Sequence, residues 1–328
     1  MPRVLAITVG WNCRDCILAG VAALQAQVGA RCDVLVVDNA STDGTAAAVR
    51  ERHPDVEVAS LPYNKGGAGG FAHGMALARD SGYDFVWLLD GDARAAPDAL
   101  VAFLTEEPRY PRAAAFAATI LRDDGSGLIQ ECGGTLDAIT GRPRFLAAGE
   151  PAATPRVGRT VDYGAACSLF VRVDAIHSIG TFDPRLFVFF DDVDWCLRAT
   201  TVGWEIRTCP ASRAWHPWHA AKKAAPWRVY YGARNQILVL GARTPAWRGA
   251  CDRWLWSWWA CRWSRRWQAA GQPLLAAAVL QGVRDAWHHP DTWQAPTSSL
   301  SAEMPVTPPR RRDSFLALVD TLRWACRS

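Results

Sequence analysis

The chain has 328 residues, half of them hydrophobic, which is enough for one large domain with an appendage or for two domains. A formal net charge of +4 is too small to argue for a nucleic-acid partner, and no apolar run approaches the roughly 20 residues of a membrane span. The ten cysteines follow no regular spacing, and no secretory signal is visible. We therefore expect a cytoplasmic protein with free thiols.

The first part of the chain alternates strand and helix patterns. Strands are expected at residues 4–9, 33–37, 56–60 and 85–89, with helices at 16–27, from about 43, and at 70–81. Single helices between strands are typical of βαβ units, so the pattern predicts an α/β fold with a mainly parallel, Rossmann-like sheet flanked by helices. Ligands of such sheets bind beyond the carboxyl ends of the strands, where the polar segments DNASTDGT, NKGGAGG and DGD fall.

The remaining sequence is less regular and then changes in composition. Strand-like pieces occur at residues 115–120 and 168–173, and a Pro/Gly-rich loop is expected at 141–159. The part that begins at Trp227 holds 11 of the 17 tryptophans, interleaved with arginines. We therefore expect one domain over residues 1–226 and a Trp/Arg-rich helical region over residues 227–328.

Two carboxylates, Asp90 and Asp92, stand where the fourth strand should end. Alternate residues of an extended chain point the same way, and paired hard oxygen ligands suit Mg²⁺ or Mn²⁺, which in turn suits a diphosphate. The alternative is a solvated turn, because Asp and Gly are ordinary turn residues.

Two further segments favour the binding of a nucleotide. Asp38, at the end of the second strand, has an acceptor for a base or ribose. Asn64, Gly66 and Gly67 open a glycine-rich segment at a helix start, where backbone donors face an anion. The segment matches neither a Walker A nor a dinucleotide motif, and its alternative is a flexible turn.

Together these motifs, followed by FFDDVDWCLRA, WHPWH and YYGARN, resemble glycosyltransferase family 2 in their order, from about Val4 to Val239. The glycine-rich segment that continues into Phe71 and Gly74 is most similar to the galactofuranosyltransferases, and rhamnosyltransferases are close relatives. The resemblance implies a GT-A fold, a nucleotide-sugar donor, a divalent cation (Mn²⁺ or Mg²⁺) and an inverting single displacement.

The resemblance also implies roles by position. Asp90 and Asp92 match the metal and diphosphate motif, His216 the histidine that completes the metal site, Asp192 the base that deprotonates the acceptor, and Asp38 the nucleoside-binding acid. The galactofuranosyl members usually have three consecutive acids where this chain has Gly91 in the middle. They also have paired tryptophans where this chain has residues 163–167, so a different acceptor is expected.

The chemistry agrees with these roles. A cation would neutralise the departing diphosphate, and the acids beside Asp192 would raise its proton affinity and suit it to act as a base. Two alternatives remain open: Asp191 and Asp192 cap a helix, or His216 and His219 bind zinc.

The expected reaction is transfer of galactofuranose or rhamnose from a UDP- or dTDP-sugar to a hydroxyl of a glycan, lipid-linked or small-molecule acceptor. The rival functions are a nucleotidyltransferase and a catalytically silent homologue that binds a glycan or serves as a scaffold.

The tryptophans and arginines near residues 254–267 are typical of a helix in the lipid headgroup zone. They predict peripheral attachment to the inner face of the plasma membrane. The alternative is a helix whose tryptophans pack against the catalytic domain.

Overall fold

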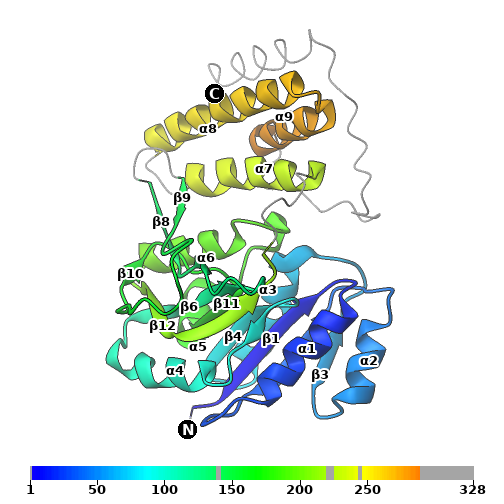
Figure 1. Ribbon diagram of the computed structural model, residues 1–328. Coiled ribbons are helices and arrows are strands. Elements are labelled where there is room, and N and C mark those ends of the chain that lie inside the picture. The colour runs from blue at the N-terminus through cyan, green and yellow to red at the C-terminus, as the bar shows by residue number, and fades with distance from the viewer. Residues whose placement is uncertain (1, 138–141, 219–224, 243–245, 289–328) are drawn as a thin grey trace. The chain divides into compact units, whose positions relative to one another are not determined.

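The computed structural model describes residues 2–137, 142–218, 225–242 and 246–288 (Figure 1). The chain divides into two compact units. Unit 1 comprises residues 1–138, 142–187 and 191–220, and unit 2 comprises residues 139–141, 188–190 and 221–328. The compositional change at Trp227 therefore lies a few residues after the chain enters unit 2.

Unit 1 begins with the expected alternation of strands and helices. Its first elements are β1 (Val4–Gly10), α1 (Arg14–Gln25), β2 (Asp33–Asp38), α2 (Thr45–Arg52), β3 (Glu57–Ser60), α3 (Gly66–Asp80) and β4 (Phe85–Asp90). Strands β3, β2, β1 and β4 lie side by side in that order and are parallel. Their carboxyl ends therefore meet at one edge of the sheet, as the sequence predicted.

The rest of unit 1 extends this sheet with long-range pairings. It adds β5 (Arg94–Ala95), α4 (Ala99–Glu106), η1 (Glu107–Arg109), β6 (Ala113–Arg122), β7 (Ile129–Glu131), β8 (Gly134–Leu136), β9 (Pro143–Phe145), β10 (Thr160–Val161), β11 (Ser168–Arg172), α5 (Val173–Ile179), η2 (Pro184–Leu186), α6 (Asp191–Thr201) and β12 (Glu205–His216). The strand order is β10-β12-β6-β11-β4-β1-β2-β3. Strand β11 runs antiparallel between β4 and β6, whereas β12 is parallel to β6. The expected loop at residues 141–159 contains β9, which pairs with β8.

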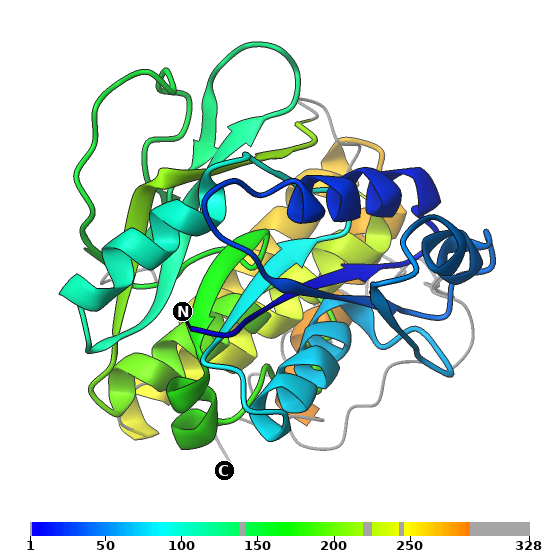
Figure 2. The ribbon, with the colours of Figure 1, turned by 90° about the horizontal axis from the view of Figure 1, so that it is seen from below.

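Helices cover both faces of the sheet (Figure 2). On one face, Ile17 of α1 and Phe103 of α4 belong to the core around Trp87, whose ring meets that of Phe103 edge-on at 5.8 Å. On the other face, Phe71 of α3 contacts Phe182. Both faces exclude water, which explains why β1, β2 and β4 are continuous apolar runs rather than alternating ones.

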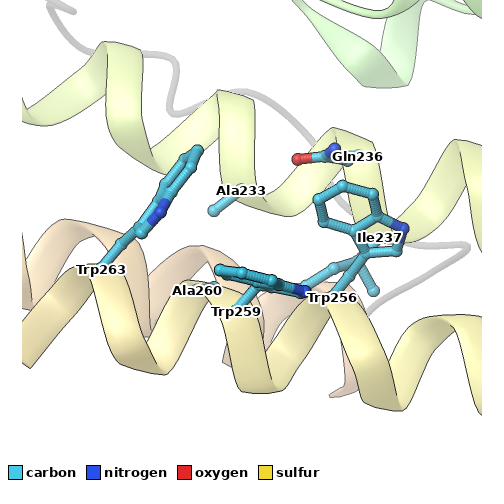
Figure 3. Close-up of a pocket in the computed structure, with 7 residues that line it drawn as sticks. All are labelled: Ala233, Gln236, Ile237, Trp256, Trp259, Ala260 and Trp263. Atoms are coloured by element: carbon cyan, nitrogen blue, oxygen red, sulfur yellow. The ribbon is translucent and has the colours of Figure 1, made fainter. Parts of the chain in front are cut away.

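The described part of unit 2 contains three helices: α7 (Pro226–Ala242), α8 (Ala246–Ala269) and α9 (Pro273–His288). Buried hydrogen bonds support their packing: Trp287 donates to the Ser257 hydroxyl at 2.9 Å, and the Ser264 hydroxyl donates to the Ala276 carbonyl at 3.0 Å. Figure 3 shows a small pocket between α7 and α8 that is lined by Ala233, Gln236, Ile237, Trp256, Trp259, Ala260 and Trp263. Across the described ranges, no helix has both the length and the apolar composition that a bilayer crossing needs.

Candidate active site

Strand β1 sets the spacing of the two acids at the sheet edge. Its last two residues pair with them, Val9 with Asp90 of β4 and Gly10 with Asp38 of β2. One strand therefore separates Asp38 from Asp90, and two strand spacings put their backbones about 10 Å apart. The Asp38 side chain is buried and accepts a hydrogen bond from the Ser41 amide at 3.2 Å.

His216 reaches the Asp-x-Asp segment through a short strand pairing. Residues 94 and 95 form β5, which pairs with the end of β12 just before His216. The Nε2 atom of His216 consequently lies 3.3 Å from Oδ1 of Asp92 and 3.9 Å from Oδ2 of Asp90. Its Nδ1 atom lies 3.2 Å from Oε1 of Gln130, which fixes the ring orientation. His219, the partner in the zinc alternative, lies outside the described residues.

A thiol that the sequence reasoning missed lies at the same place. Cys167 directly precedes β11, and its carbonyl accepts a hydrogen bond from the Asp90 amide at 3.4 Å. Asp90, Cys167 and His216 each offer one ligand atom, and these three atoms all lie within 4.8 Å of one another. Burial, followed by the negative charge of Asp90, raises the pKa of the Cys167 thiol well above its ordinary value. The sequence holds no local spacing signal for Cys167, because the other two residues come from different strands.

Steric crowding explains why a glycine, Gly91, separates the two acids. A Cβ atom at this position would lie 2.6 Å from the carbonyl oxygen of Val9 and 2.9 Å from a methyl carbon of Ile17. The middle acid of the galactofuranosyl pattern therefore has no room here.

The glycine-rich segment is helical earlier than expected. The sequence placed the helix start at Gly70, but α3 begins at Gly66. The buried side chain of Asn39 holds the preceding turn, because its Oδ1 accepts from the Lys65 amide at 2.8 Å and its Nδ2 donates to the Gly66 carbonyl at 2.9 Å. Asn64 accepts from the Gly66 amide at 2.8 Å. The polar turn is thus ordered by residues that the sequence reasoning did not consider together.

Crowding explains only some of these glycines. Gly66 has φ +72°, and a Cβ atom there would lie 2.1 Å from the Phe187 carbonyl oxygen, so both its conformation and its surroundings require glycine. A Cβ atom on Gly67 would meet nothing within 4 Å. Crowding therefore accounts for the glycine at position 66 but not for the one at position 67.

Asp191 and Asp192 begin α6, and their environments differ. Asp191 is buried, and burial together with the charge of Asp192 raises its pKa well above the ordinary value. Asp192 is partly exposed. Its Oδ2 accepts from the Ala166 amide at 3.2 Å, and its Oδ1 accepts from the Val193 amide at 2.7 Å. Burial still raises its pKa, and the two backbone donors oppose that shift. Both acids lie inside the first turn of α6, where a helix favours negative charge.

A second acid near Asp192 was missed by the sequence reasoning. Glu131, at the end of β7, is only 7% exposed, and its Oε2 has no hydrogen-bond partner among the described residues. Burial first, and the charge of Asp192 second, raise its pKa to about 8. The tripeptide Ile129–Glu131 looks like ordinary strand edge, so no sequence signal pointed to it.

The sheet order, with acids at the carboxyl ends of its parallel strands, is that of a GT-A fold. The family model and the curated relatives described below make the protein a glycosyltransferase. The sequence pattern described as Glycosyl transferase family 2 matches residues 6–155, which confirms the resemblance to that family.

Three known proteins show the extent of the similarity. The N-acetylglucosaminyl-diphospho-decaprenol L-rhamnosyltransferase of Mycobacterium tuberculosis (strain ATCC 25618 / H37Rv) is 28% identical over 243 residues, 67% of this chain and 78% of that protein. Galactofuranosyltransferase GlfT2 of the same strain is 31% identical over 80 residues, 24% of this chain and 12% of that protein. The crystal structure of GalNAc-T7 with UDP, GalNAc and Mn²⁺ superposes with a TM-score of 0.57 at 12% identity, over 73% of this chain and 48% of that one. This chain thus spans about half of GalNAc-T7.

Proposed function

We propose that this glycosyltransferase is inverting and metal-dependent, and that it moves rhamnose or galactofuranose from a dTDP- or UDP-sugar to an acceptor hydroxyl. The observation that carries the proposal is the approach of His216 to within 3.3 Å of Asp92 and 3.9 Å of Asp90. The names of the two mycobacterial relatives support the choice of sugars. The name of the rhamnosyltransferase, which includes a decaprenol, favours a lipid-linked acceptor over other glycans or a small molecule.

In this proposal Asp90, Asp92 and His216 hold Mn²⁺ or Mg²⁺. Two carboxylates and one imidazole fit such an ion, because hard oxygen ligands dominate the set. When bound, the ion stabilises the charge that develops on the departing diphosphate. The nucleotide contacts Asp38 and the Asn64, Gly66 and Gly67 turn, which lie at the same sheet edge.

Asp192 acts as the base on the acceptor hydroxyl. Its two backbone donors fix the carboxylate in one orientation and leave further lone pairs for a substrate proton. A raised pKa brings such a carboxylate closer to the working pH of an enzyme.

The proposed catalytic domain is residues 1–226, and residues 227–328 form a helical region that contacts the cytoplasmic face of the plasma membrane. Trp258 and Trp263 of α8 are 48% and 43% exposed, and Arg262, Arg265 and Arg266 of the same helix are exposed too. Exposed indoles and cations on one helix suit an anionic headgroup layer. Trp256 and Trp287 are buried inside unit 2, so packing accounts for part of the tryptophan cluster.

A set of nucleotide sugars tests whether donor binding depends on a metal ion. UDP- and dTDP-sugars are added with and without Mn²⁺, and the melting temperature is measured for the wild type, Asp92→Ala and the exposed control Asp80→Ala. A ligand at 100 times its Kd stabilises a protein by about 2.7 kcal/mol. We expect Mn²⁺-dependent stabilisation in the wild type and in the control only. Stabilisation of Asp92→Ala equal to that of the wild type would refute the metal site.

A further inference from the structure

We propose that Cys167 gives the cation site a second, thiophilic mode of binding, in which Zn²⁺ or Cd²⁺ is held by Asp90, Cys167 and His216. The ligand atoms of these residues all lie within 4.8 Å of one another, and Nε2 of His216 is already 3.9 Å from Oδ2 of Asp90. A tetrahedral zinc ion with ordinary bond lengths places its ligand atoms about 3.3–3.6 Å apart. Side-chain rotations that bring these atoms about 1 Å closer together would give that spacing.

The fold holds the three ligands at the ends of three strands of one sheet. Asp90 ends β4, His216 ends β12, and Cys167 directly precedes β11, which pairs with β4. The thiol is 6% exposed, so it is shielded from bulk solvent but faces the site acids. The charges of Asp90 and Asp92, which oppose formation of a thiolate, also favour a cation beside it.

Binding in this mode exchanges a proton for a metal–sulfur bond. The Sγ–H bond of Cys167 breaks, its proton leaves to the buffer, and the sulfur donates an electron pair to the metal; no atom is oxidised or reduced. Three protein ligands leave a fourth position for water, as in many zinc sites.

The thiophilic mode differs from the proposed Mn²⁺ mode in one ligand. Hard ions prefer the oxygens of Asp90 and Asp92, whereas a soft or borderline ion gains from the sulfur. Because the two modes share Asp90 and His216, this inference rests partly on the proposed function. It predicts that Zn²⁺ and Cd²⁺ compete with Mn²⁺ for the site.

Cadmium titration of the full-length protein provides the test. A Cd²⁺–thiolate bond has an ultraviolet charge-transfer band, which is recorded for the wild type, Cys167→Ser, His216→Ala and the control Cys132→Ser. Cys132 is a buried thiol that accepts a hydrogen bond from Thr119 and does not belong to the group formed by Asp90, Cys167 and His216. The exposed thiols Cys16 and Cys251 are replaced in all of these proteins, the wild-type reference included, to lower the background.

We expect one equivalent of tightly bound Cd²⁺ in the wild type and the control. Loss of the sulfur ligand or of His216 should weaken binding on the order of 10-fold or more, since even the outer-shell partners of metal ligands contribute that much. Melting curves without metal show whether each variant is folded. An unchanged band in Cys167→Ser would overturn the inference.

Asp92→Ala separates this inference from the proposed function. If the variant loses Mn²⁺-dependent nucleotide binding but keeps the Cd²⁺ band, both proposals hold. If the wild type shows the band but no Mn²⁺ response, the proposed function fails alone. If Mn²⁺ acts as expected but no Cys167-dependent band forms, the thiophilic mode fails alone.

Discussion

Asp191 and Asp192 are neighbours in sequence, but only Asp192 is partly exposed, with two backbone donors on its carboxylate. Asp192→Asn should leave nucleotide binding nearly intact and lower kcat on the order of 100-fold or more, which is typical of a lost general base. Asp191→Asn should lower kcat less and change the free energy of unfolding more, because Asp191 is the buried member.

The pH profile gives an independent check on Asp192. Burial raises the pKa of its carboxyl above the ordinary 3.8, and a base must be deprotonated, so the acidic limb of kcat should lie above that value. Steady-state rates across pH and a nucleotide titration of each variant provide the measurements. Equal losses of kcat in both variants would leave the division of roles unsupported.

Glu131 makes a separate prediction about stability. Its pKa is about 8 in the folded protein against an ordinary value of 4.5, so between these values the folded state keeps a proton that the unfolded state releases. Stability from this group is therefore fully present below pH 4.5 and falls as the pH rises towards 8. Glu131→Gln cannot lose that proton. We expect its free energy of unfolding, relative to the wild type, to rise across this window.

Denaturant unfolding at several pH values measures this difference. Glu51→Gln on the exposed side of α2 is the control and should follow the wild type throughout. Parallel pH dependence of Glu131→Gln and the wild type would show that the buried acid is ionised in both states.

At the scale of elements, the start of α3 depends on one glycine more than on its neighbour. Gly66→Ala combines a positive φ with a Cβ atom 2.1 Å from the Phe187 carbonyl oxygen, so it should destabilise the protein by more than about 1 kcal/mol. Gly67→Ala has open space and should gain up to about 1 kcal/mol from helix propensity. Chemical denaturation of both variants tests this contrast, and equal stabilities would mean that the Phe187 contact does not constrain the turn.

The same elements show what a sequence can predict. The parallel arrangement of β1, β2, β3 and β4, though not their order, followed from alternating patterns, and so did the gathering of Asp38 and Asp90 at one edge. The helix was expected from Gly70, whereas α3 begins at Gly66, and the Ala68 amide in its first turn donates to the Phe187 carbonyl at 3.0 Å. Glycine is a poor helix former, so the sequence gives little signal for this earlier start.

Residues that depend on pairing between distant strands could not be found this way. The antiparallel insertion of β11 brings Cys167 to Asp90, and β7 carries Glu131 towards the site. Neither arrangement leaves a local spacing that a periodicity argument detects. His216 and Asp192 were found only because longer motifs around them resemble a family.

At the scale of the whole molecule, the exposed arginines of α8 predict that the protein binds to an anionic membrane surface. Replacing Arg262, Arg265 and Arg266 by glutamine should release it from anionic vesicles, since each basic residue contributes about 1 kcal/mol near such a surface. Loss of all three arginine charges corresponds to roughly a 100-fold change in partitioning of the protein between vesicles and solution. Sedimentation with anionic and with zwitterionic vesicles at low and high salt measures the effect.

The control for this experiment replaces Arg31, Arg50 and Arg52 by glutamine, which removes the same charge from the exposed surface of unit 1. It should sediment like the wild type. A wild-type protein that ignores anionic vesicles at low salt would contradict membrane contact, and the acceptor would then be sought among soluble molecules.

Gly91 restricts how this protein could diverge from its relatives. An aspartate at that position would restore the three-acid pattern with a change to a single codon, yet its Cβ atom would approach the backbone oxygen of Val9. Trimming Ile17 removes only one of the two obstacles, because a main-chain atom cannot be mutated away. A third acid at this position would therefore require the backbone of β1 at Val9 to move, in addition to the change of residue.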